Sequence, residues 1–198
     1  LTTRYLSQGL AFLIGGLLAF AFFTLNWMFA LRRSYAGGNR PVDARPSRFL
    51  RIPLWVISAA VFVVAGLFTA DQWVTWLLFS GGGDFGIVDP IFGRDVGFYV
   101  FALPVLTIVQ DTALSIVILT AVVTLVVYII GFGLDGLDLR NPPLRMRTHV
   151  LALIGGIVLL FGLGYLLANF ELQYSTRGFT YGVGFTDAVV ARWVNYAL

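Results

Sequence analysis

The sequence predicts an all-α protein: a polytopic membrane helix bundle with four full spans, an interfacial hairpin and the start of a fifth helix. Two observations carry this prediction. First, 59% of the 198 residues are hydrophobic and 12% are charged, whereas a soluble domain usually has about a quarter of its residues charged. Second, four uncharged runs are each long enough to cross a hydrocarbon core of about 30 Å. We therefore expect residues 1–198 to form one membrane-embedded helical domain.

The four apolar runs give the expected spans, in chain order. The uncharged runs are residues 9–31, 52–70, 112–134 and 150–170, and the expected spans are about residues 9–31, 52–70, 105–134 and 150–170. The third is expected to open just after Pro104, because proline is tolerated in the first turn of a helix. Residues 71–104 then form an outer interfacial loop. Residues 171–198 form a second outer loop and the start of a helix, for which Thr186 is a suitable cap.

The distribution of arginine predicts the orientation of these spans. Loop 32–51 holds six arginines against one acidic residue, Asp43, and loop 135–149 holds three more arginines. Short arginine-rich loops remain on the cytoplasmic side during insertion. We therefore expect both loops in the cytoplasm and residues 71–104 and 171–198 on the extracytoplasmic side of a bacterial inner membrane. The lipid bilayer is the first expected partner.

The outer loop 71–104 carries the most distinctive pattern in the chain. Its candidate interfacial motif consists of Asp84, Asp89, Pro90, Arg94, Asp95, Phe98 and Tyr99. Asp89 can cap a short helical turn that has Pro90 at its first position, and Asp95 can cap a second segment. The aromatic residues are then expected at the level of the headgroups. The spacing of the aspartates does not match a calcium loop, so no metal site is predicted.

A second candidate site is built around an acidic residue near the start of the third span. Asp111 lies about two helical turns after Pro104, at or below the outer headgroups. Acidic groups at that depth usually pair or line a hydrated path, and Arg94 and Arg177 are the candidate partners on the same side. A structural ion pair is favoured over a proton relay, because no second acid lies deeper in any span.

Two further patterns concern the packing of helices. Thr120, Thr124 and Tyr128 recur every four residues on the third span and predict a polar seam toward a neighbour. Gly15 and Ala19, also four residues apart, allow close approach of another helix on the first span.

Few residues in the sequence are suited to catalysis or cofactor binding. Cysteine is absent and His149 is the only histidine, so no catalytic combination of side chains is recognised. His149 starts the fourth span, where a histidine can ligate the metal of a haem or chlorin, although a capping role is more common there. We therefore expect a non-enzymatic protein with no cofactor, no bound metal and no nucleic-acid partner.

The stretch from Gly82 to Pro104, GGDFGIVDPIFGRDVGFYVFALP, closely resembles the signature of uncharacterised protein family 0182, which comprises large bacterial multi-pass membrane proteins. The similarity continues through the third and fourth spans to Ser175–Gly178 and Gly184–Asp187. The resemblance implies that one span precedes Leu1 and that further spans and a large extracytoplasmic domain follow. The chain is therefore expected to be a fragment of a longer protein.

These observations leave three functions open. The leading hypothesis is a membrane anchor or scaffold for a large extracytoplasmic domain or envelope complex, acting within a membrane-protein complex or homo-oligomer. The second is a transporter or channel component that uses an outward-facing polar site at Asp111, Arg94 and Arg177. The third is an accessory subunit of a pigment or respiratory complex, which depends on His149 alone.

Overall fold

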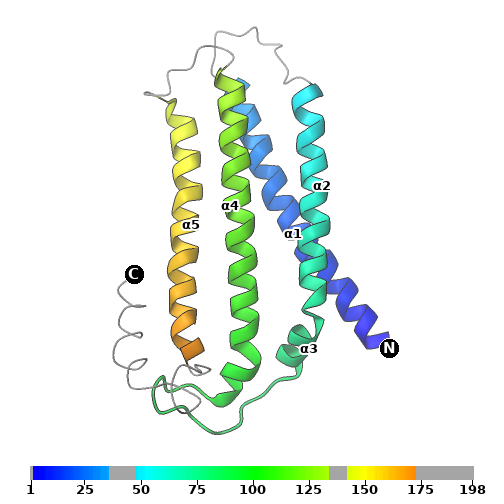
Figure 1. The fold of residues 1–198 in the computed structure, drawn as a ribbon, viewed down its shortest axis with the longest axis vertical. Coiled ribbons are helices and arrows are strands. Elements are labelled where there is room, and N and C mark those ends of the chain that lie inside the picture. The colour runs from blue at the N-terminus through cyan, green and yellow to red at the C-terminus, as the bar shows by residue number, and fades with distance from the viewer. Residues whose placement is uncertain (1, 36–47, 134–141, 173–198) are drawn as a thin grey trace. The chain divides into compact units, whose positions relative to one another are not determined.

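The computed structural model describes residues 2–35, 48–133 and 142–172, and within these ranges it is helical with no β-strand (Figure 1). The helices are α1 (Thr2–Tyr35), α2 (Arg48–Asp71), α3 (Trp73–Gly81), α4 (Leu103–Gly133) and α5 (Leu144–Glu171), with a π-helical turn η1 (Phe98–Ala102) before α4. Four segments are long and apolar enough to cross a membrane: Thr3–Ser34, Arg48–Asp71, Phe98–Gly131 and Leu144–Glu171. The predicted all-α class with four spanning helices is confirmed.

The helices extend beyond the uncharged runs from which the spans were predicted. Helix α1, for example, continues to Tyr35 and so includes Arg32 and Arg33 in its last turn. Backbone hydrogen bonding does not stop at the first charged residue, and cationic side chains stabilise the carbonyl end of a helix. The predicted spans at residues 9–31, 52–70 and 150–170 are therefore the apolar middle of longer helices, and α4 begins two residues before the predicted third span.

The start of the third span differs from the prediction. The helix was expected to begin just after Pro104, but the π-helical turn Phe98–Ala102 leads directly into α4. Proline has no N–H to donate and its ring crowds the preceding turn, so that turn widens. The Leu103 amide accordingly donates to the Phe98 carbonyl, five residues back.

The chain divides into two compact units. The first unit comprises the described residues within 1–72 and 115–157, and the second unit those within 73–114 and 158–198. The first unit thus contains α1, α2, the C-terminal part of α4 and the N-terminal part of α5. The second contains α3, the loop after it, η1 and the remaining parts of α4 and α5.

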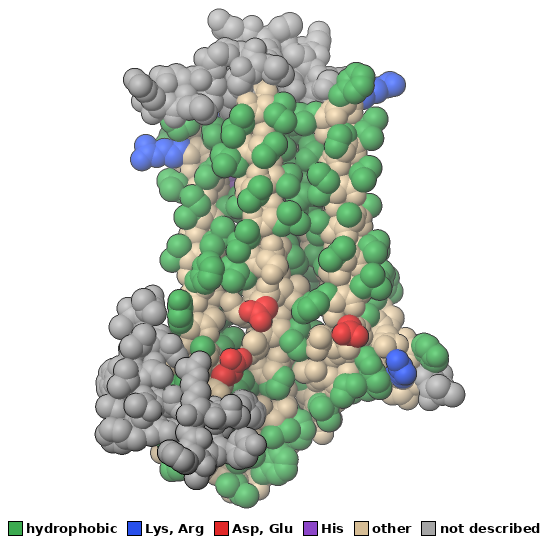
Figure 2. All heavy atoms as spheres, viewed as in Figure 1, with side chains coloured by type: hydrophobic (Ala, Val, Ile, Leu, Met, Phe, Trp, Pro, Cys, Tyr) green, Lys and Arg blue, Asp and Glu red, His purple; other side chains and the backbone are tan. Residues whose placement is uncertain are grey.

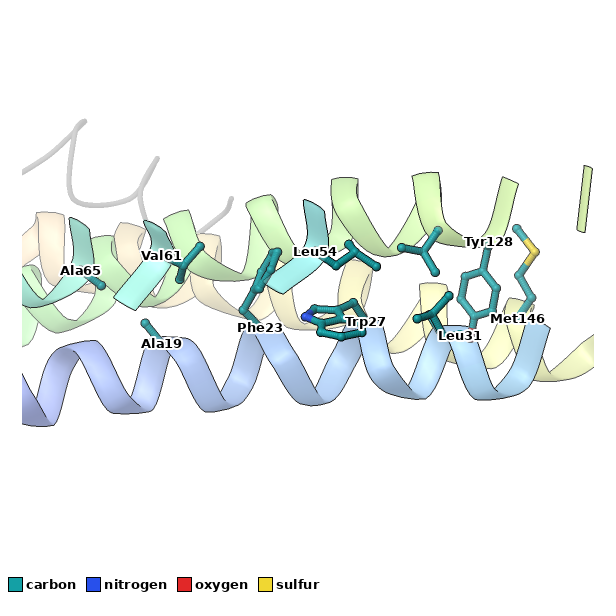
Figure 3. Close-up of a cluster of buried hydrophobic side chains, with 11 residues drawn as sticks. Ala19, Phe23, Trp27, Leu31, Leu54, Val61, Ala65, Tyr128 and Met146 are labelled. Carbon is teal, nitrogen blue, oxygen red and sulfur yellow. The ribbon is translucent and has the colours of Figure 1, made fainter. Parts of the chain in front are cut away.

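A row of buried apolar side chains forms the core of the first unit (Figure 3). Helix α1 supplies Ala19, Phe23, Trp27, Ala30 and Leu31, and the other helices supply Leu54, Val61, Ala65, Val127, Tyr128 and Met146. The α1 residues are spaced by three and four, so they share one face of the helix. This face packs against α2 along most of its length.

Small residues bring α1 and α2 close together. A Cβ atom at Gly16 would lie 2.8 Å from the Phe62 carbonyl oxygen of α2, and one at Gly15 would collide with the Thr69 side chain. Ala19 is buried one turn further along. The small-residue face predicted on the first span is therefore the contact face for α2.

Hydrogen bonds join the same two helices. The Trp27 indole N–H donates to the Ser58 hydroxyl at 2.9 Å, and the Thr69 hydroxyl lies 2.9 Å from the Ala11 carbonyl oxygen. Such bonds between helices are favourable in lipid, where water is not available as an alternative partner.

The second unit has its own aromatic core. Tyr99, Leu103 and Leu167 are buried together, and Phe92, Phe98 and Phe170 pack around them. The Phe98 and Phe170 ring centroids are 5.2 Å apart at an interplanar angle of 72°, an edge-to-face arrangement. Tyr99 is only 5% exposed. Its side chain therefore packs within the protein, and its position at the headgroup level stays a prediction.

Hydrophobic side chains cover much of the visible helix surface (Figure 2). Many of them are more than half exposed, among them Leu18, Val64 and Leu159. In a soluble protein such surface would aggregate, whereas in a bilayer it is the surface in contact with lipid.

Candidate functional site

The side chain of His149 hydrogen-bonds to two other helices of the first unit. Its Nδ1 lies 2.9 Å from the Tyr128 hydroxyl oxygen of α4, and its Nε2 lies 3.0 Å from the Asn26 Oδ1 of α1. His149 is itself on α5 and is 8% exposed. One buried imidazole therefore connects three helices, and we call Asn26, Tyr128 and His149 the histidine cluster.

The hydrogen-bond pattern fixes the protons in this cluster. The Asn26 Nδ2 donates to the Phe22 carbonyl oxygen at 2.7 Å, which leaves Asn26 Oδ1 as the acceptor. The His149 Nε2 must then carry the proton and donate it to Asn26, because a carbonyl oxygen cannot donate. The Nδ1 is left as an acceptor for the Tyr128 O–H. Since that lone pair is already used, the arrangement does not favour His149 as a haem or chlorin ligand.

Arg33 borders the histidine cluster. Its guanidinium carbon lies 3.8 Å from the centroid of the Phe29 ring, and its Nη1 donates to the Arg145 carbonyl oxygen at 2.8 Å. The Phe29 ring in turn meets the His149 ring edge-to-face, with centroids 4.9 Å apart. These contacts add a cation–π interaction and a second hydrogen bond between α1 and α5.

The polar seam predicted on the third span is buried as one face of α4. Thr120, Thr124 and Tyr128 are each at most 1% exposed. The Thr120 hydroxyl donates to the Ile116 carbonyl of its own helix at 2.7 Å, whereas Thr124 Oγ1 has no hydrogen-bond partner within the described ranges. Tyr128, by contrast, bonds to a side chain of another helix, the His149 imidazole of α5. The seam therefore faces the protein, as predicted, but its hydrogen bonding is uneven.

The structure describes two of the three residues of the predicted site around Asp111. Asp111 is exposed on α4 and Arg94 is exposed in the loop before η1, where its guanidinium carbon lies 5.5 Å from the Phe98 ring centroid. Arg177 lies outside the described residues. The pairing of Asp111 with an arginine therefore stays a prediction.

The predicted interfacial motif has a well-defined centre at Asp89. Its carboxylate accepts the backbone N–H groups of Ile91 at 3.2 Å and Phe92 at 2.7 Å, and the Tyr99 hydroxyl at 3.0 Å. The Gly93 amide donates to the Asp89 carbonyl at 2.9 Å. Asp89 therefore caps a turn, as predicted, although residues 90–92 form a single turn and not a helix.

Asp95 closes the other side of the same loop. Its Oδ1 accepts the amides of Phe85 at 2.9 Å and Gly97 at 2.7 Å. These amide bonds, with that from Phe85 the strongest influence, hold the pKa of the Asp95 carboxyl below its ordinary value of 3.8. The Val96 amide also bonds the Ile87 carbonyl at 2.9 Å. Asp95 thus ties the start of the third span to the loop, while Asp84 and Pro90 are exposed.

The second unit contains a buried amide that its neighbours do not satisfy. Asn169 is 1% exposed, and neither its Oδ1 nor its Nδ2 has a hydrogen-bond partner within the described ranges. Elsewhere in this unit Gln110 Nε2 donates to the Leu160 carbonyl at 3.1 Å, and the Thr107 hydroxyl donates to Glu171 Oε1 at 3.0 Å. Asn169 is therefore the exception among these polar side chains.

Asn26, Arg33 and Asn169 were not among the predicted site residues. A signal for two of them was present, because asparagine inside an otherwise apolar span must bury an amide and needs a partner there. The role of Arg33 had no local signal, since its acceptor lies on α5 and is distant in the sequence.

The amino-acid sequence of the chain is similar to those of known proteins. The model of an uncharacterised protein family, UPF0182, matches residues 1–198. A UPF0182 protein of Trichlorobacter lovleyi is 33% identical over 96% of this chain and 22% of its own length. One from a Geobacter species is 33% identical over 94% of the chain and 22% of its own length. One from Clostridium perfringens is 36% identical over 83% of the chain and 19% of its own length.

The chain therefore spans about a fifth of the length of these relatives. No solved structure matches it.

Proposed function

The chain belongs to the uncharacterised protein family UPF0182, and from this premise we propose that it acts as a non-enzymatic membrane scaffold. It anchors a large extracytoplasmic domain or an envelope complex. Its partners are the lipid bilayer and a membrane-protein complex or a second copy of the chain, and not a nucleic acid. The relatives are about five times as long as this chain, which supports a role as one part of a larger protein.

The observation that carries this proposal is the histidine cluster. In the first unit the polar side chains suited to chemistry, Tyr128 and His149, are committed to hydrogen bonds between helices. A buried polar network in which every member has a partner makes a structure rigid. Such a network suits a scaffold, whereas a catalytic residue must keep an atom available for substrate.

The proposed orientation places the scaffold in an inner cell membrane. Four arginines lie at the end of α1 and the start of α5 in the first unit: Arg32, Arg33, Arg145 and Arg147. The bond between Arg33 and the Arg145 carbonyl places these two ends together. By the positive-inside rule this end faces the cytoplasm, so loops 32–51 and 135–149 are cytoplasmic and 71–104 and 171–198 extracytoplasmic.

The test measures assembly of the full-length protein in its native membrane. Replacing His149 with Leu removes both hydrogen bonds of the ring, and the scaffold proposal expects less of the assembled complex by size-exclusion chromatography with light scattering. Replacing Tyr165, an exposed tyrosine of α5, with Phe is the matched control and should leave assembly unchanged. Normal assembly of the His149→Leu variant contradicts the proposal.

A transporter or channel component is the second candidate, and Asn169 is the observation that favours it. A buried amide without a protein partner in a spanning helix is typical of a site that holds water or a polar ligand. Asp111 and Gln110 also lie in this unit. This candidate predicts that Asp111→Asn or Asn169→Leu abolishes proton flux, measured with a pH-sensitive dye in proteoliposomes, while assembly stays intact. The scaffold proposal predicts no flux in either the wild type or the variants.

A further inference from the structure

An open-sided pocket of about 390 Å³ lies next to the histidine cluster in the first unit. It is lined by Leu25, Asn26, Met28, Phe29 and Arg32 of α1 and by His149 of α5. Leu25, Phe29 and Arg32 are separated by four and three positions, so they lie on one face of the helix. Its volume lies within the range of about 300–1,000 Å³ that is common for small-molecule sites.

The charge on the described residues that line the pocket is positive and is carried by Arg32. Arg32 is exposed, and within the described residues its guanidinium has no partner. No carboxylate is among the described residues that line the pocket. Arg33, Arg145 and Arg147 lie near the same helix ends and add to the positive potential. A ligand that neutralises Arg32 must therefore be an anion.

The remaining wall of the pocket is apolar and open. Leu25 is 65% exposed and Phe29 is 41% exposed. Both side chains lie on the same α1 face as Arg32: Phe29 is about one turn before Arg32 and Leu25 about two turns before it. The pocket thus offers a cationic group at one end and an apolar strip leading away from it, which is complementary to an amphiphile with an anionic head.

Asn26 adds a polar group between the cationic end of the pocket, at Arg32, and its apolar strip. One hydrogen of its amide is used by the Phe22 carbonyl, and its Oδ1 accepts from His149. The second amide hydrogen is not used by these bonds and can donate to a phosphate or ester oxygen. The histidine cluster therefore also fixes the position of a donor in the pocket.

We propose that this pocket binds the headgroup of an anionic phospholipid. The phosphate meets Arg32, the glycerol region meets Asn26, and the first part of an acyl chain follows Leu25 and Phe29 into the bilayer. Basic pockets between membrane helices are known to hold anionic headgroups in this way. The proposal is independent of whether the protein is a scaffold or a transporter.

The experiment titrates the full-length protein in detergent with phosphatidylglycerol or phosphatidylcholine and counts bound lipids by native mass spectrometry. We expect phosphatidylglycerol to bind more tightly than phosphatidylcholine. Arg32→Gln should weaken phosphatidylglycerol binding roughly fivefold, the equivalent of about 1 kcal/mol for one arginine at an anionic lipid. Arg32→Lys, which keeps the charge, should retain most of the affinity.

Arg147→Gln is the matched control, because Arg147 is an exposed arginine near the same helix end that does not line the pocket. It should change phosphatidylglycerol binding by less than about twofold. Equal losses in Arg32→Gln and Arg147→Gln overturn the proposal, since they indicate diffuse attraction and no specific site. Equal binding of the two lipids, or displacement of phosphatidylglycerol by the same concentration of inorganic phosphate, also overturns it. Thermal unfolding of each variant confirms that it is folded.

Discussion

The contact between α1 and α2 and the loop at residues 85–97 are held together by opposite means. The helix contact depends on glycine, apolar packing and two hydrogen bonds between uncharged groups of the helices. The loop depends on two carboxylates, Asp89 and Asp95, that accept backbone amides. The difference follows from the surroundings: carboxylates are costly within lipid, whereas at its edge they are available to satisfy amides that a loop leaves unpaired.

The largest effect is expected from Gly16 in the helix contact. Gly16→Leu forces a side chain against the Phe62 carbonyl of α2, a backbone atom that cannot move aside. We expect a loss of about 3 kcal/mol in unfolding free energy, the upper part of the usual range for overpacking. Gly9→Leu on the same helix is the control, because a Cβ at Gly9 meets nothing within 4 Å. Denaturation followed by circular dichroism in micelles measures both, and equal effects would argue against the close contact.

The next effect is expected at Asp89 in the loop. Asp89→Ala removes an acceptor from two backbone amides and from the Tyr99 hydroxyl. The cost should be about 2 kcal/mol, because a lost cap and a buried hydroxyl without a partner both contribute. The control is Asp84→Ala, since Asp84 is exposed in the same loop. If both substitutions leave the thermal midpoint unchanged, the loop is not held by Asp89.

A smaller effect is expected from Ser58 in the helix contact. Ser58→Ala removes the acceptor for the Trp27 indole. We expect the unfolding free energy to fall by about 0.6 kcal/mol, the average contribution of a hydrogen bond between membrane helices. Ser80→Ala is matched to it: both serines bond a carbonyl of their own helix, but only Ser58 accepts from another helix. Tryptophan fluorescence during unfolding compares the two, and a larger effect at Ser80 would contradict this assignment.

The smallest effect concerns pH and Asp95. The folded-state pKa of Asp95 lies below its unfolded value of about 3.8, so its ionised form stabilises the loop. This contribution is fully present above the unfolded pKa and is lost as pH falls through the lower folded pKa. The ¹⁵N amide signals of Phe85 and Gly97 should stay constant from about pH 7 to pH 5 and move together below about pH 4. In Asp95→Asn this movement should be absent, and its persistence would assign it to another group.

The sequence predicted those features that depend on neighbouring residues. The four spans follow from uncharged runs, and the cap at Asp89 follows from Asp–Pro at the start of a turn. The burial of Thr120, Thr124 and Tyr128 followed from helical spacing. Each of these depends on residues within a few turns of one another, for which a single sequence is sufficient.

The remaining features depend on contacts between distant parts of the chain. Nothing near His149 indicates that Asn26 will accept its proton, because the helix that presents Asn26 is far away in the sequence. The π-helical turn was also missed, since the sequence shows Pro104 but not that the helix continues before it. The role of Asp111 stays a prediction because Arg177, one of its two expected partners, lies outside the described residues.

The central claim is that His149 joins three helices, and it can be measured directly because the chain has a single histidine. In protein labelled with ¹⁵N-histidine, the signals that are absent from His149→Leu belong to this imidazole. We expect a protonated Nε2 and an unprotonated Nδ1 whose signal shifts in Tyr128→Phe and not in Tyr165→Phe. A mixture of tautomers in exchange with water, insensitive to Tyr128→Phe, would contradict the account.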